Sequence, residues 1–400
     1  MNATMYNVVF PLAKKNEYLA NDTVDFVLSL ENKKLVPGSL AITGECQILK
    51  DVNAGTAIGV NDEVLIDPDA GYHACFRDFV SEFREIGLTE SFSYYPRYIK
   101  MRTQATMLRD SLGTETFNCI EGKCMNEVVR KGYNYGATDQ GQNLGNNGLS
   151  FVIKPEIAPN KSNVPVPGNQ VGVVRIRCRL APNGEVCYGA DSASAGYKLT
   201  NLQVRYETIV DDGSREPLTM EIYNVARQVI ETNNANLATF VPGLADSVHM
   251  SFCRADHEAV DTNNYLECQT IPGKPLSFAG NNPALGQAGG VPEGSNDIQP
   301  SPNQGASRLY YAVNDTDTAL VGFTMQSRSE MLWNYLRSWS NEPKNYAIAL
   351  RRLIEGKGYG LGINFGAPIS FAQQKFSAEI DSEVASATSV YMYFRGMRTF

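Results

Sequence analysis

The sequence predicts an all-β protein built from sandwiches or barrels of short strands. Apolar and polar residues alternate along many short segments, which is the periodicity of half-buried strands. Along 174–180, for example, apolar side chains occupy one face and three arginines occupy the other. Turn-forming pairs recur between such segments, at Pro37-Gly38, Asn183-Gly184, Asp212-Gly213 and Pro242-Gly243. Regularly spaced short strands and turns are typical of this fold class, in which helices are few and short.

Strands are expected along the whole chain. Two early strands, at 24–30 and 39–49, are separated by the turn at Pro37-Gly38. Later strands are expected at 174–180, 202–208, 246–252 and 389–397. The last of these is rich in aromatic and β-branched residues, which strands favour.

Three segments are candidate helices. In 75–87 the apolar residues Phe76, Phe79, Val80 and Phe83 recur at helical spacing, and Gly87 is suited to end a helix. The same residues also fit a strand, so both interpretations remain open. The other two candidates are 329–340 and 345–356.

Residues 356–365, GKGYGLGINF, place a glycine at every second position. A phosphate-binding loop needs glycines in a tight turn before a helix, and the P-loop also needs a following Lys-Ser/Thr. Here apolar residues alternate with the glycines, and Pro368 follows before a helix could form. We predict a strand whose glycine face lets a neighbour approach closely.

Two long segments rich in Gly, Pro, Asn and Gln, at about 134–170 and 269–307, are expected to be surface loops. Because strand patterns resume after each of them, the chain is expected to contain two similar domains. We place these domains at 1–212 and 213–400, with a seam near Asp211-Asp212-Gly213.

Composition excludes several classes of protein. The 400 residues carry a net charge of -8, which argues against a nucleic-acid-binding surface. Neither a signal peptide nor an apolar run long enough to cross a bilayer is visible, so a soluble chain made in the cytoplasm is expected. Eight cysteines without an export signal favour free thiols. A hairpin turn at Asn183-Gly184 would leave Cys178 and Cys187 only diagonal neighbours, too far apart for a disulfide.

No residue pattern predicts catalysis or a cofactor. The best metal candidate is His249 with Cys253 and His257, with Cys268 downstream. Strand periodicity around His249 separates the first two by four residues, too far to share one zinc ion. No nucleophile motif is present either, so we expect no catalytic, cofactor or metal site.

The stripe formed by Arg175, Arg177 and Arg179 is the most unusual charged feature. It is either a solvated outer face or a surface that meets an acidic neighbouring subunit or phosphate. It is therefore our candidate subunit interface.

Three stretches resemble viral jelly-roll capsid proteins. They are 30–48, with its paired strands, 71–102, and the C-terminal strands of 356–396. In 71–102 the likeness places an apolar strand, then Glu90 in a polar turn, then the aromatic and basic segment 94–97. Two such halves are similar to the double jelly-roll major capsid proteins of tailless membrane-containing phages, adenoviruses, virophages and large DNA viruses.

This resemblance implies a non-enzymatic virion protein that forms homotrimers, the pseudo-hexagonal capsomers of an icosahedral shell. The implied partners are other copies of the chain, neighbouring capsomers, minor capsid or penton proteins and an internal membrane. Alternatives are a minor capsid, penton or spike protein, a carbohydrate-binding β-sandwich that uses 269–307, and a jelly-roll enzyme.

Overall fold

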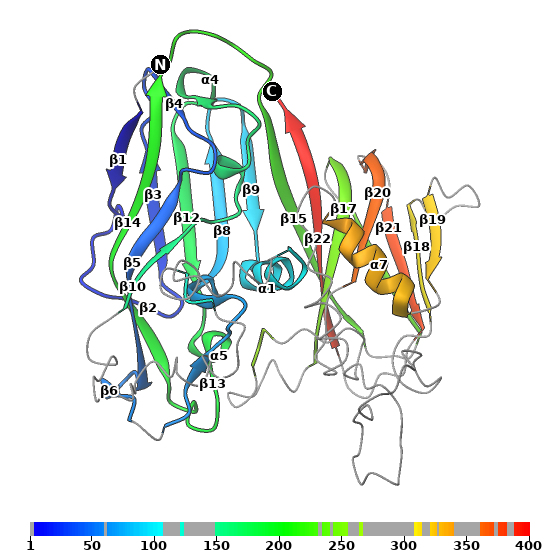
Figure 1. The fold of residues 1–400 in the computed structure, drawn as a ribbon, viewed down its shortest axis with the longest axis horizontal. Helices are drawn as coiled ribbons and strands as arrows, with labels where there is room; N and C mark the ends of the chain where they lie inside the picture. The colour runs from blue at the N-terminus through cyan, green and yellow to red at the C-terminus, as the bar shows by residue number, and fades with distance from the viewer. Residues whose placement is uncertain are drawn as a thin grey trace.

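The chain folds into two groups of β-sheets that stand side by side, as the computed structural model shows in Figure 1. The connection from one group to the other passes over the end of the molecule at which both termini lie (Figure 1). The structure describes residues 4–59, 62–106, 121–123, 149–230, 234–240, 243–254, 264–266, 308–313, 321–325, 328–339, 361–371, 375–381 and 388–400.

In the first group, here called the first barrel, the part of the chain that the structure describes forms eight strands of five or more residues. They are β1 (Met5–Val9), β3 (Thr23–Leu28), β5 (Ala41–Asp51), β8 (Phe76–Phe83), β9 (Leu88–Phe92), β10 (Leu149–Ile153), β12 (Val174–Leu180) and β14 (Gly196–Val210). Shorter strands are β2 (Tyr18–Leu19), β4 (Lys33–Leu35), β6 (Thr56–Ala57), β7 (Leu65–Ile66), β11 (Val166–Pro167) and β13 (Cys187–Tyr188). The helices within its described ranges are η1 (Gly71–Cys75), α1 (Tyr95–Thr106), η3 (Ala158–Asn160), α4 (Gly168–Val171) and α5 (Asn183–Val186).

In the second group, here called the second barrel, the described residues form eight strands and α7 (Arg328–Ser338). The strands are β15 (Thr219–Ile230), β16 (Asn234–Phe240), β17 (Leu244–Arg254), β18 (Arg308–Val313), β19 (Val321–Met325), β20 (Leu361–Ser370), β21 (Lys375–Asp381) and β22 (Thr388–Thr399).

The main strands have the same order in both barrels. In the second barrel one sheet runs β15-β22-β17-β20 and the other runs β16-β21-β18-β19. In the first barrel the corresponding sheets run β1-β14-β5-β10 and β3-β12-β8-β9. Counted along the chain, each barrel therefore pairs its first, eighth, third and sixth strands in one sheet and its second, seventh, fourth and fifth in the other. Most consecutive strands alternate between the two sheets, which is the connectivity of a jelly roll.

Most of the predicted strands are present. The alternation along 174–180 corresponds to β12, where Val174, Ile176, Cys178 and Leu180 are buried. Predicted strands at 24–30, 39–49, 202–208, 246–252 and 389–397 overlap β3, β5, β14, β17 and β22. The predicted helix at 329–340 is α7, whereas the one predicted at 345–356 lies outside the described residues.

The helical interpretation of 75–87 is wrong, and the strand interpretation is correct. The pairing of β8 with β12 shifts register between Arg179 and Leu180, so a bulge lies close to Phe76. A bulge adds a residue without reversing the face, and it lets Phe76 and Phe79 both point into the core. From Phe79 onward burial follows the strand period of two, through Ser81 to Phe83. The helical spacing of the phenylalanines was therefore produced by a strand irregularity.

Two further expectations fail in the first barrel. The predicted hairpin at Asn183-Gly184 is instead one helical turn, α5, and Cys187 pairs through β13 with β7 and not with β12. Residues 149–170, expected to be the second half of a loop, contain β10, which pairs with β5. The aromatic and β-branched residues of β10 outweigh its glycine-rich and asparagine-rich surroundings. The predicted loop at 269–307 lies outside the described residues.

The described cysteines are free thiols: Cys46, Cys75, Cys178, Cys187 and Cys253. The division at 212 and 213 remains a prediction about domains. Sheets of β1–β14 and sheets of β15–β22 share no paired strands among the described residues, apart from one isolated bridge between Ser162 and Met220.

The described part of the glycine run, 361–365, lies in the strand β20, as predicted. Helix α7 packs against this strand at Gly362. A Cβ atom on Gly362 would lie 2.2 Å from Ser338 Oγ and 3.2 Å from Tyr335 Cα. The absent side chain therefore allows the close approach of the helix.

Substituting valine for Gly362 is expected to lower the free energy of unfolding by about 1–3 kcal/mol, because α7 must move away from the sheet. Chemical denaturation monitored by Trp339 fluorescence measures this loss. Ala367→Val, at an exposed position of the same strand, is the matched control and should change stability little. Equal stability of the two variants would contradict the packing argument.

Candidate functional site

Aromatic side chains from both barrels meet at the junction between them. The ring of Phe92, at the end of β9, stacks on Tyr223 of β15 with 4.6 Å between centroids and contacts Tyr98 of α1 at 5.1 Å. Tyr98 Oη and Tyr223 Oη lie 2.6 Å apart in a hydrogen bond. On β22, Tyr393 donates its hydroxyl to the carbonyl of Tyr94 at 2.9 Å. These residues come from distant parts of the sequence, and the fold brings them into one buried cluster.

The first barrel also covers the edge of the second barrel's sheet. Strand β15 is an edge strand, so alternate backbone N–H groups point away from its sheet. Thr219 N–H donates to Asn163 Oδ1 at 2.8 Å, and Glu221 N–H donates to the carbonyl of Lys161 at 2.9 Å. Tyr223 N–H donates to Glu90 Oε1 at 3.2 Å. Three successive outward donors are therefore satisfied by the first barrel.

Glu90 is the buried carboxyl group of this junction. It lies in the strand β9 and not in the polar turn expected from the sequence, and it is 2% exposed. Its second oxygen, Oε2, accepts the N–H of Ala158 at 2.8 Å, and Ser81 lies directly opposite on β8. Burial raises the pKa of the Glu90 carboxyl to about 8, although the two backbone donors act in the opposite direction.

The aromatic and basic segment 94–97 begins α1, a helix that the sequence did not predict. Arg97 is fully buried between the rings of Tyr265, at 4.3 Å, and Tyr391, at 4.7 Å. Its Nη2 donates to the carbonyl of Tyr265. Tyrosine faces stabilise a guanidinium that is removed from water. Arg97 therefore ties α1 to the second barrel through cation–π contacts.

A second buried cation on α1 has an acidic partner. Lys100 Nζ forms an ion pair with Asp67 Oδ2, which also accepts a hydrogen bond from Asn264 Nδ2 at 2.6 Å. Burial by itself raises the pKa of Asp67, but the Lys100 ammonium, together with hydrogen bonds from Asn264 and from the N–H of Ala70, outweighs burial and lowers that pKa to about 2. Asn264 comes after β17 of the second barrel, so this ion pair also helps to join the two barrels.

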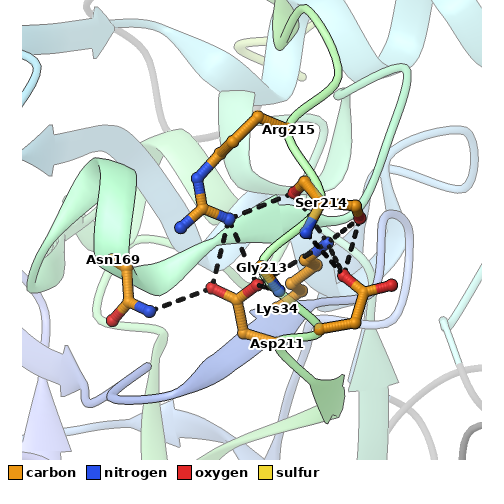
Figure 2. Close-up of polar contacts among 7 residues, drawn as sticks. Lys34, Asn169, Asp211, Gly213, Ser214 and Arg215 are labelled. Atoms are coloured by element: carbon orange, nitrogen blue, oxygen red, sulfur yellow. Dashed lines mark hydrogen bonds and ion pairs between the residues drawn. The ribbon is translucent and has the colours of Figure 1, made fainter.

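The connection between the barrels is held against the first barrel by charged side chains around Lys34 (Figure 2). Lys34 Nζ donates to Asp212 Oδ1 at 2.6 Å and to Ser214 Oγ at 2.7 Å. It also lies 3.6 Å from Asp211 Oδ1. The hydrogen bond from Lys34 is the main reason that the pKa of Asp212 lies well below its usual range. Residues 212 and 214 are thus held against the first barrel by Lys34.

Asp211 gathers the remaining contacts of this connection. Its carboxylate accepts hydrogen bonds from Asn169 Nδ2 at 3.1 Å and from Arg215 Nη1 at 3.2 Å (Figure 2). Its Oδ1 also accepts the N–H of Gly213 at 3.0 Å, which sits at a φ of +76°. Glycine adopts this left-handed conformation without strain, so the chain turns sharply there. Together with the junction, these contacts set how the two barrels stand relative to each other.

Solved structures of known proteins share this architecture. The Faustovirus major capsid protein matches with a TM-score of 0.64 at 8% identity, over 100% of this chain and 91% of its own. A chain of the PBCV-1 virus capsid matches with 0.55 at 11% identity, over 100% and 95%. A chain of the Sputnik virophage matches with 0.52 at 8% identity, over 99% and 85%. The chain has the double jelly-roll fold. The sequence itself matches no protein-family model and no curated protein.

The arginine stripe lies on the outer face of the double jelly roll's first barrel, with its charges balanced there. Arg175 and Arg177 share Asp25 of β3, at 3.2 and 3.0 Å, and Arg179 lies 3.9 Å from Asp78 of β8. All three arginine side chains remain at least 36% exposed. A neighbour that bound here would meet alternating charges and not a uniformly positive surface.

The two described residues of the metal candidate, His249 and Cys253, contact different partners. His249 lies on β17, where its Nδ1 is 3.0 Å from Ser338 Oγ and its ring stacks on Trp339 at 3.9 Å. Cys253 lies further along the same strand and donates to the carbonyl of Tyr265. His257 and Cys268 lie outside the described residues. Within the described ranges, no three His, Cys, Asp or Glu side chains come together as metal ligands.

The double jelly roll also exposes an apolar row that the sequence analysis missed. Tyr6, Val8 and Phe10 project from one face of β1 and the residue after it, and they are 80%, 49% and 54% exposed. Leu12 continues the row at 63% exposure. The sequence MYNVVFPL carried this signal. Apolar residues at every second position give a strand one apolar face, which is either exposed or buried by a partner. Exposed apolar rows of this kind mark interaction surfaces.

Proposed function

We propose that the chain is a major capsid protein, which assembles as a homotrimer into the pseudo-hexagonal capsomers of an icosahedral shell. The observation that carries the proposal is the likeness of the whole chain to chains of viral particles, one of them a major capsid protein. The match spans both barrels and nearly the full length of each neighbour. A shell subunit with two similar barrels presents six barrels per trimer, which gives a hexagonal outline from threefold symmetry.

The role proposed is structural and not catalytic. The buried polar groups at the junction bind other groups of the protein: Glu90 accepts backbone N–H groups, and Arg97 contacts tyrosines. These hydrogen bonds and ring contacts join the two barrels. The first barrel covers the edge of β15, and a covered edge suits a protein that is packed at high concentration, because open strand edges promote aggregation.

The proposed partners are other copies of the chain, neighbouring capsomers, minor capsid or penton proteins and a membrane inside the shell. The proposed location is the virion, after synthesis in the host cytoplasm. None of the helices in the described ranges is long and apolar enough to span a bilayer. We also retain the arginine stripe of Arg175, Arg177 and Arg179 as a candidate subunit contact, in which its acidic partners would be exchanged for those of a neighbour.

Light scattering on the purified protein tests the trimer. We expect one stable species at about three times 43.9 kDa, resistant to tenfold dilution. A protein that remains a monomer at high concentration would contradict the proposal. In that case, binding to a glycan array would identify a carbohydrate-binding sandwich. A stable oligomer with another stoichiometry would favour a penton or spike protein.

A further inference from the structure

Arg97 differs from the other buried cations of the protein in having no acidic partner. Among the described residues, five lysine and arginine side chains are buried, each at most 7% exposed. Four of them form ion pairs with carboxylates: Lys34 with Asp212, Lys100 with Asp67, Lys123 with Glu121, and Arg395 with Asp246. Arg97 is the fifth and is 1% exposed, and no carboxylate of the described residues forms an ion pair with it.

The guanidinium of Arg97 also has more hydrogen-bond donors than acceptors around it. Its Nη2 donates to the carbonyl of Tyr265, whereas Nε and Nη1 have no hydrogen-bond partner within the described part of the chain. The rings of Tyr265 and Tyr391 stabilise the charge, but they contact the guanidinium through their faces. Arginine keeps its charge in proteins. A permanent positive charge is therefore buried with two donors unsatisfied, and both conditions cost free energy.

The carboxyl group of Glu185 does not supply the missing negative charge. It pairs with another cation, Arg77, at 3.4 Å. Burial raises the pKa of Glu185, and the charges of Arg77 and Arg97 act against that rise. Two arginines thus act on one carboxyl group, which leaves a net positive charge on this side of the junction.

The chemistry around Arg97 determines which anion would suit it. Helix α1 lies between the two barrels (Figure 1), and Arg97 meets Tyr391 of β22 and Tyr265, which comes after β17. The surroundings are buried and aromatic, so a multiply charged anion such as phosphate or sulfate would lose too much hydration there. A small monovalent anion loses less, and it balances the single charge of the guanidinium.

We propose that Arg97 binds a chloride ion at the junction of the two barrels, through the donors Nε and Nη1. The chloride ion gives this arginine the negative partner that each of the other four buried cations finds in a carboxylate. Because the guanidinium belongs to α1 and its ring contacts belong to the second barrel, bound chloride would stabilise the closed junction. The site lies within one chain and does not depend on assembly.

The first test measures stability against chloride. Chloride replaces gluconate at constant ionic strength and one protein concentration, and the protein is unfolded with urea, which adds no chloride. We expect the folding equilibrium to rise about a hundredfold when chloride reaches a hundred times its dissociation constant, because only the folded state holds the site. Arg97→Met keeps the apolar stem and removes the charge, so its stability should not respond to chloride. Arg84→Met, at an exposed position just after β8, is the control and should keep the wild-type response.

The second test uses the wild-type protein and needs no variant to fold. Crystals are grown with bromide in place of chloride, and the anomalous scattering of bromide is mapped. We expect a bromide ion in contact with Nε or Nη1 of Arg97. Bromide found only at exposed side chains would overturn the proposal.

Two results of the urea titration would overturn it as well. One is a wild-type stability that chloride leaves unchanged, and the other is an equal response in wild type and Arg97→Met. Neither result bears on the capsid proposal, which is tested by the mass of the assembled protein.

Discussion

Replacing Phe92 with alanine is expected to lower the free energy of unfolding by about 3–5 kcal/mol and to loosen the two barrels from each other. Phe92 is fully buried and its ring contacts those of Tyr95, Tyr98, Tyr223 and Tyr393. Truncation leaves a cavity between the barrels that neither sandwich can fill alone. Amide hydrogen exchange should therefore accelerate at Thr219, Glu221 and Tyr223, the edge donors that the first barrel covers.

Phe26→Ala is the matched control for this prediction. Phe26 is equally buried but lies on β3, inside the first barrel. We expect a similar loss of stability, with exchange accelerated along β3 and β12 and not selectively at the β15 edge. If Phe92→Ala cost less than about 1 kcal/mol, or gave the same exchange pattern as Phe26→Ala, the junction would not depend on this aromatic cluster.

The stability of the protein is expected to fall as pH rises from about 5 to about 8, because of Glu90. Its pKa in the folded protein, about 8, lies above the ordinary value of 4.5 that applies after unfolding. Between these values the folded state holds a proton that the unfolded state releases. Stability from this group is therefore present below about pH 4.5 and is lost as pH rises toward 8, by at most tenfold in the folding equilibrium per pH unit.

Glu90→Gln should remove this pH dependence. The amide stays neutral, but its single acceptor oxygen can keep only one of the two backbone hydrogen bonds, from Ala158 or Tyr223, which costs about 1 kcal/mol at low pH. Denaturation midpoints measured from pH 5 to 9 test this. Glu82→Gln, on the opposite face of the same hairpin, should keep the wild-type slope. A slope that persists in Glu90→Gln would show that the carboxyl is not its source.

The alternation of apolar residues predicted most of the sandwich, because strands with one buried face must follow a period of two. It failed where backbone irregularity changed that period, as at the bulge near Phe76. The hairpin turn predicted at Asn183-Gly184 failed as well. This pair lies in one helical turn, and Cys187 after it pairs with β7. Local turn chemistry does not determine which strand a segment meets.

Helix α1 had little signal because polar side chains are buried among its apolar ones. Arg97, Lys100 and Gln104 take the place of an apolar stripe, and their partners Tyr391, Asp67 and Asp69 are distant in sequence. Pro96 near the start was the remaining indication, since proline is favoured in the first turn of a helix. The junction could not be inferred for the same reason, because Glu90 accepts hydrogen bonds from N–H groups that lie 68 and 133 residues away in the sequence.

Imaging of the purified oligomer by electron cryo-microscopy tests the central claim most directly. We predict a threefold particle in which six barrels form a ring, with first and second barrels alternating and their strands running along the threefold axis. Each first barrel should contact the second barrel of the next copy. A particle of another symmetry, or one in which first barrels meet first barrels, would contradict the account.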